Sequence, residues 1–187
     1  LMVGPVTWIC NYLLVNQSNG YSQMANFDIA NQWRNTIMFI PAALAQIALP
    51  LLASNVHNQS EYKTIFNKNL KINIYLGLFL VILFVIVSPI IVHFYGEKYQ
   101  DALLPIIIMF VTTGCITVNN VIGQAIASQG KMWLGFYVNL IWAIVLLISC
   151  YMLVVIFPMG AVGISLAYLI SYITHTIVQF IYIKKFI

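Results

Sequence analysis

Charged residues are scarce in this 187-residue chain, since Asp, Glu, Lys and Arg together make up 6% of it. In ordinary soluble domains about a quarter of the residues are charged. Conversely, 62% of the residues are hydrophobic and the mean hydropathy is +0.94. This composition excludes a soluble globular domain and predicts an integral membrane protein.

The chain also lacks the side-chain clusters that catalysis or metal binding requires. Its carboxylates are Asp28, Glu61, Glu97 and Asp101. Only the last two lie near each other, and although His93 precedes them at helical spacing, Gly96 interrupts that stretch. The sequence contains no phosphate-binding glycine loop, zinc motif or nucleophile elbow. We therefore expect no enzyme, no metal, no cofactor and no nucleic-acid partner.

Cysteines are few and carry no pattern, because Cys10, Cys115 and Cys150 all fall in apolar runs without a short spacing. We interpret them as small buried hydrophobic residues. The chain starts at Leu1 and shows no basic leader with a cleavage site, so we expect a fragment whose first apolar segment is truncated.

What the sequence does contain is a series of long apolar segments, each of them long enough to cross a bilayer as a helix except the short first one. The segments cover residues 1–16, 21–53, 72–95, 102–128, 132–157 and 160–183. Short turns separate most of them, while the longer stretch 54–71 predicts an interfacial helix. The pattern predicts an all-α integral membrane protein, a bundle of six transmembrane helices.

The lysines predict an orientation for this bundle. If all six segments cross, one side holds Lys63, Lys68, Lys71, Lys131, Lys184 and Lys185, and the other side holds Lys98. Positive charge collects on the cytoplasmic side of a membrane. We therefore expect both chain ends in the cytoplasm and the turns at 16–20, 95–101 and 157–160 outside.

Polar residues concentrate in the second segment, although a charge near the bilayer centre costs at least about 2.5–3.5 kcal/mol. At helical spacing one line down this segment contains Asp28, Gln32, Asn35, Phe39, Ala42 and Gln46. Arg34 lies about 120° round the helix from Asp28, so the two are not expected to pair. The pattern leaves two placements open for these charges: a wet cavity, or the outer interface with Arg34 snorkelling.

Two other segments carry polar stripes at helical spacing. The fourth has Thr113, Thr117, Asn120, Gln124 and Ser128, and the sixth has Ser165, Tyr168, Tyr172, His175, Gln179 and Tyr182. Such residues also hydrogen-bond between packed membrane helices, for about 0.6 kcal/mol on average. Several stripes in one small bundle favour a shared hydrophilic cavity. The third segment has only Ser88 between Leu76 and Val92, which predicts a lipid-facing position.

Four stretches carry a family resemblance: GYSQMANFDIANQWRNTIMFIPAALAQIALPLLAS, FYGEKYQDALLPIIIMF, ASQGKMWLGFYVNLIWA and PMGAVGISLAYLISYITHT. In this order they resemble the C-terminal half of a bacterial O-antigen or capsular polysaccharide flippase. Such flippases form the polysaccharide transporter family of the multidrug, oligosaccharidyl-lipid and polysaccharide exporter superfamily. The resemblance implies two six-helix lobes, of which this chain is the C-terminal lobe and the N-terminal lobe is absent from it.

The same resemblance implies a function in the bacterial inner (plasma) membrane. A flippase of this kind moves undecaprenyl-diphosphate-linked oligosaccharide repeat units across the membrane by alternating access. Its implied partners are membrane lipids, this lipid-linked substrate and the N-terminal lobe. The first, second and fourth segments would line the central cavity, whereas the sixth stripe either packs inside its lobe or lines a second cavity.

The candidate cavity-lining residues are Asp28, Asn31, Gln32, Arg34, Asn35, Asn120, Gln124, Trp8 and Trp33. In this hypothesis the guanidinium of Arg34 binds the diphosphate as a forked cation. The aromatic rings of Trp8, Trp33 and Tyr12 contact the sugar rings. Asp28 either couples transport to a cation gradient or is structural. Two alternatives remain. One is a multidrug exporter of the same superfamily, which usually depends on an acidic cavity; Asp28 alone, opposed by Arg34, argues weakly against it. The other is a non-transporting scaffold or enzyme subunit, which predicts dry polar stripes.

Overall fold

The computed structural model describes the backbone of residues 2–186 and the side chains of residues 2–183. Its helices are α1 (Val3–Val15), α2 (Gly20–Ser54), α3 (Gln59–Tyr95), α4 (Leu103–Ser128), α5 (Met132–Cys150) and α6 (Gly160–Phe186). A 3₁₀ helix, Glu97–Ala102, leads into α4, and a π-helical turn, Tyr151–Ile156, extends α5. All except the short apolar α1 are long and apolar enough to cross a membrane. The prediction of an all-α membrane helix bundle is confirmed.

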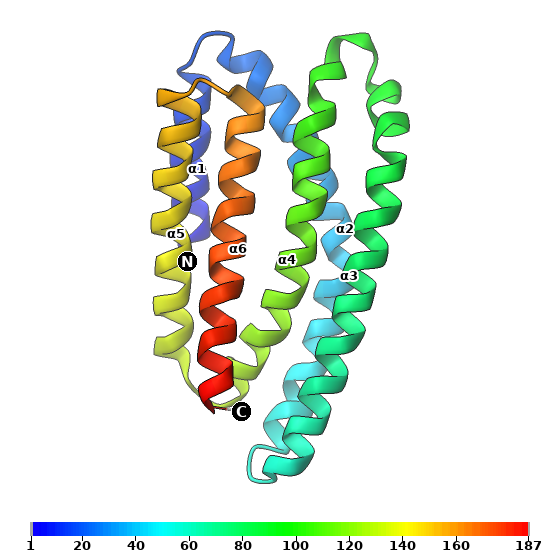
Figure 1. The fold of residues 1–187 in the computed structure, drawn as a ribbon, viewed down its shortest axis with the longest axis vertical. Coiled ribbons are helices and arrows are strands. Elements are labelled where there is room, and N and C mark those ends of the chain that lie inside the picture. The colour runs from blue at the N-terminus through cyan, green and yellow to red at the C-terminus, as the bar shows by residue number, and fades with distance from the viewer. Residues whose placement is uncertain (1, 187) are drawn as a thin grey trace.

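The helices run up and down between two ends of the molecule (Figure 1). The connections 16–19, 96–102 and 157–159 lie at the upper end of that view, and the connections 55–58 and 129–131 lie at the lower end with the C-terminus. The α2–α3 hairpin reaches farthest at the lower end. The predicted orientation also used Lys184 and Lys185. Their side chains lie outside the described residues.

Helix α3 begins earlier than its apolar pattern predicted. Asn58 caps it, because its side-chain oxygen accepts a hydrogen bond from the Glu61 backbone N–H at 3.3 Å. Residues 59–71 are therefore the first turns of α3, and the prediction of a separate interfacial helix was wrong. The apolar side chains of Tyr62 and Phe66 are buried inside the bundle, which holds this stretch in line with the rest of the helix.

Helix α4 is the centre of the bundle, since it packs extensively against α2, α3 and α6. In its most apolar stretch 50% of the residues are buried, against 28% in α2 and 22% in α3. At its lower end the Tyr62 hydroxyl of α3 lies 3.0 Å from the Ala125 carbonyl oxygen and 2.9 Å from Ser128 Oγ. These contacts fix α3 against α4.

Helix α3 occupies the edge of the bundle, as its apolar sequence predicted (Figure 1). Along its outer side Tyr75, Phe79, Ile82 and Ile86 are all more than half exposed. Ser88 is buried and donates to the Val85 carbonyl of its own helix. An apolar outer face of this kind is suited to contact with acyl chains.

Candidate functional site

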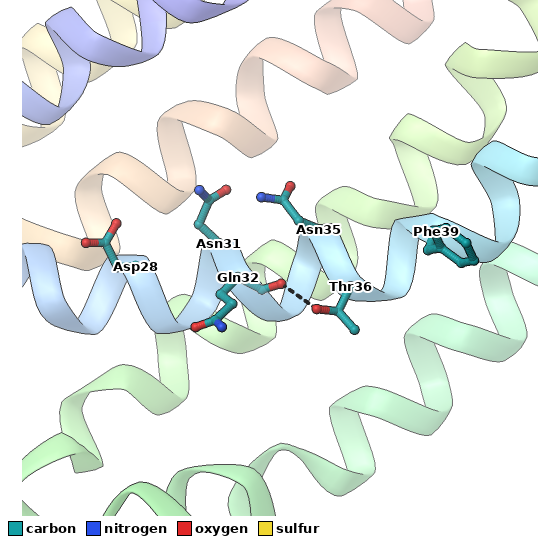
Figure 2. Close-up of a pocket in the computed structure, with 6 residues that line it drawn as sticks. All are labelled: Asp28, Asn31, Gln32, Asn35, Thr36 and Phe39. Carbon is teal, nitrogen blue, oxygen red and sulfur yellow. Dashed lines mark hydrogen bonds between the residues drawn. The ribbon is translucent and has the colours of Figure 1, made fainter.

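One hydrophilic feature of the bundle is an open groove of about 710 Å³ along α2. It is lined by Asp28, Asn31, Gln32, Asn35, Thr36 and Phe39. Figure 2 shows Asp28, Asn31 and Asn35 along one edge of this lining and Gln32 along its other edge. A single helix therefore supplies the lining, because these positions recur every three or four residues and share one face.

The groove faces outward from the bundle. Asp28, Gln32 and Asn35 are exposed, and the Phe39 ring at its lower limit is 76% exposed. Asp28 lies about 12 Å and Asn35 about 22 Å along the axis from the start of α2 at Gly20. Within the hydrocarbon core, which is about 30 Å thick, such polar groups would need water or another protein surface beside them.

Arg34 points the other way, into the bundle. Its guanidinium carbon lies 5.2 Å from the centre of the Tyr168 ring on α6, a cation–π arrangement. Its Nη2 donates to Asn35 Oδ1 at 3.0 Å, which links it to the groove. The buried Nε and Nη1 have no hydrogen-bond partner among the described residues. The guanidinium thus links α2 to α6, and its Nε and Nη1 donors remain available for another acceptor.

The polar stripe of α6 lies inside the lobe. Ser165, Tyr168, His175 and Gln179 are all buried. Of the two alternatives that the sequence left open, this burial favours packing within the bundle. Within the described part of the chain, both ring nitrogens of His175 and Oε1 of Gln179 lack a hydrogen-bond partner. The stripe therefore keeps hydrogen-bonding capacity that the protein's own groups do not use.

The polar stripe of α4 divides into two parts. Thr113 and Thr117 are buried and donate to carbonyls one turn earlier in their own helix, at 3.0 and 2.8 Å. These threonines serve as dry packing residues. Asn120 and Gln124 are half-buried, and neither lines the groove on α2.

The candidate aromatic residues lie outside the groove. Trp8 is 66% exposed on α1 and stacks on Tyr12 with 5.7 Å between ring centres. Trp33 instead turns toward α3, where its Nε1 donates to the Tyr95 hydroxyl at 3.2 Å. The two tryptophans therefore belong to different surfaces of the molecule.

Of the nine candidate residues, the structure brings four together in the groove: Asp28, Asn31, Gln32 and Asn35. The candidate set did not include Thr36 or Phe39, which complete the lining. The helical spacing had already placed Phe39 on the line of Asp28, Gln32 and Asn35, and Thr36 could have been found because it follows Gln32 by one turn.

The family model and the relatives that match this chain agree with each other. Residues 6–104 match a family model described as polysaccharide biosynthesis protein. The chain is 29% identical over 178 residues to the EPS I polysaccharide export inner membrane protein EpsE of Ralstonia solanacearum, and 30% identical over 173 residues to that of Ralstonia nicotianae. Each match covers 91% of this chain, and the chain spans 39% of the length of each relative. No solved structure matches the chain significantly.

Proposed function

This chain belongs to the polysaccharide biosynthesis protein family, and from that membership we propose that it forms one six-helix lobe of a bacterial polysaccharide exporter. The relatives that it matches are named as polysaccharide export inner membrane proteins. Because the chain spans 39% of their length, the remainder of such a protein has room for a second lobe. The proposed role is transport and involves no catalytic step.

The hydrophilic face of α2 is the observation that supports this proposal most strongly. A membrane helix with Asp28, Gln32 and Asn35 exposed on one face is costly if that face meets lipid. It is favourable if that face lines a wet passage against a second lobe, as transporter sites near the bilayer midplane do. A scaffold with dry polar stripes accounts for Thr113 and Thr117 but not for this exposed face.

The proposed cargo is an oligosaccharide linked to a polyprenyl diphosphate, moved by alternating access. Arg34 is the single basic residue of α2 and holds unpartnered Nε and Nη1 donors, which suit a phosphate oxygen once the guanidinium leaves the Tyr168 ring. The exposed Trp8–Tyr12 stack offers aromatic surface to sugar rings. Asp28 is the proposed point of coupling to a cation.

Cysteine accessibility tests the wet passage. In a protein whose native cysteines are replaced, Asn35→Cys and Gln32→Cys are expected to react in membranes with a charged, water-soluble thiol reagent. Phe79→Cys is the matched control, because Phe79 is 61% exposed on the lipid-facing side of α3 and should not react. Equal reactivity at Asn35 and Phe79 would contradict a passage beside α2, and labelling at Asn35 is expected to block polysaccharide export.

A further inference from the structure

A second hollow lies between α2 and α3, toward the lower end of the hairpin, and has a volume of about 350 Å³. On the α2 side it is lined by Leu44, Ile47, Ala48 and Leu51, which form one apolar helical face. This face extends about 10 Å along the helix, or roughly two thirds of the thickness of one hydrocarbon leaflet. Ile47 and Leu51 are more than half exposed, so the hollow opens to the surroundings of the bundle.

The α3 side of this hollow is not purely apolar. It presents Ile65, Lys68, Asn69 and Ile72, again on one helical face. Among the described residues that line the hollow none is acidic. The carboxylate of Glu61, the acidic residue of α3, accepts from Asn58 at the start of that helix instead. Lys68 is exposed, so an anionic head group outside the protein can pair with its ammonium.

Asn69 adds an unused donor to this cation. Its Oδ1 accepts from Asn73 at 2.8 Å, but its Nδ2 is buried and has no hydrogen-bond partner in the described part of the chain. Lys68 lies about 14 Å along α3 from its first residue, Gln59. Because helical side chains tilt toward the N-terminus, the Lys68 ammonium leans toward the hairpin end, where lipid head groups lie.

We propose that this hollow binds an anionic phospholipid, with one acyl chain along the apolar faces of α2 and α3 and the phosphate at Lys68 and the Asn69 amide. The charge of the phosphate complements Lys68 and the nearby exposed Lys71, and its oxygens accept from the unpartnered Nδ2. The site is separate from the groove on α2, which is lined by residues 28–39. It anchors the projecting hairpin to one leaflet.

Native mass spectrometry of the intact protein in mild detergent tests the proposal. The probes are dioleoylphosphatidylglycerol and dioleoylphosphatidylcholine, which share acyl chains and differ in charge. The anionic lipid is expected to bind more tightly. Lys68→Gln should lower its affinity about fivefold, which is the contribution of one basic side chain at an anionic lipid surface. The same variant should leave the affinity for the phosphatidylcholine unchanged.

Two further variants distinguish binding in the hollow from a general effect of surface charge. Ile47→Trp fills the hollow from an exposed position and should weaken binding of both lipids. Lys98→Gln removes the same charge at the opposite end of the bundle and should change neither affinity. Equal binding of the two lipids to the unmodified protein, or no effect of Lys68→Gln, would overturn the proposal. Displacement of the phosphatidylglycerol by a polyprenyl phosphate at far lower concentration would also overturn it, assigning the hollow to a lipid carrier instead.

Discussion

Arg34 connects the outward groove to the interior of the lobe. Its guanidinium lies over the Tyr168 ring, while its Nη2 holds the Asn35 side chain at the groove. Helical spacing correctly separated Arg34 from Asp28, since both positions belong to one helix. Helical spacing could not predict the contact with Tyr168, which lies 134 residues later in the chain. The partner of a buried charge is set by how helices pack, and one helix does not contain that information.

Substitution of Arg34 is expected to impair export. Arg34→Ala removes both the cation–π contact and the forked donor, so we expect export to fall at least about tenfold, as for loss of one charge-assisted contact of about 1.5–3 kcal/mol. Arg34→Lys should retain part of the activity because it keeps the charge but not the fork. Surface polysaccharide is measured at matched protein levels.

Tyr168→Phe is the control for that series. It preserves the ring under the guanidinium and should leave export close to normal, since the hydroxyl does not take part in the cation–π contact. Full export by Arg34→Ala at normal protein levels would show that neither contact of Arg34 is needed for transport.

Gly160 is a second position where one residue determines local structure. Its φ of +55° is left-handed, and a Cβ there would collide with the Gln23 side chain. That side chain accepts from the Ala161 backbone N–H at 2.8 Å and so caps the start of α6 from α2. We expect Gly160→Ala to destabilise the protein by about 1–2 kcal/mol, measured as a lower thermal unfolding midpoint in detergent.

The matched control for Gly160 is Gly123→Ala in α4. A Cβ at Gly123 meets no atom within 4 Å, and its backbone is helical, so this substitution should leave the midpoint unchanged or raise it slightly. A midpoint that falls equally for both variants would show that the left-handed turn at Gly160 is not the cause.

At the scale of helices, the two polar stripes show what periodicity can predict. The spacing correctly grouped the residues of α4 and of α6 on single faces. It did not predict that Thr113 and Thr117 pack dry, or that Tyr168 and His175 turn into the lobe. A face is a property of one helix, but whether it meets water, lipid or protein depends on its neighbours. The apolar α3 was placed correctly because a helix with almost no polar side chain suits a lipid-facing edge.

The seam between α3 and α4 gives a prediction at this scale. The Tyr62 hydroxyl joins the Ala125 carbonyl and Ser128 Oγ, across an otherwise apolar contact. Tyr62→Phe is expected to lower the free energy of unfolding by about 1 kcal/mol, because the ring stays packed and only the hydrogen bonds are lost. Tyr75 lies on the outer side of α3 and is 72% exposed, so Tyr75→Phe should have no effect in the same detergent unfolding measurement.

At the scale of the whole molecule, the proposed orientation follows from which connections share an end. The connections 16–19 and 96–102 lie together, opposite the hairpin loop 55–58 (Figure 1). We expect Ser18→Cys and Glu97→Cys to react with a membrane-impermeant thiol reagent added to intact spheroplasts. His57→Cys should react only after permeabilisation, because positive charge collects on the cytoplasmic side and this end holds Lys63, Lys68 and Lys71. The reverse pattern would mean that the protein is inserted the other way round.

The central position of α4 has a consequence for how the protein is made. Helices α1, α2 and α3 precede α4 in the chain and share little surface with one another, whereas α2 and α3 each pack extensively on α4. As the chain leaves the ribosome from its N-terminus, these three helices enter the bilayer before the helix that unites them. Until α4 arrives, the sides of α2 and α3 that pack on it have no protein neighbour. A nascent chain stalled before Leu103 is therefore the form most exposed to membrane quality-control proteases.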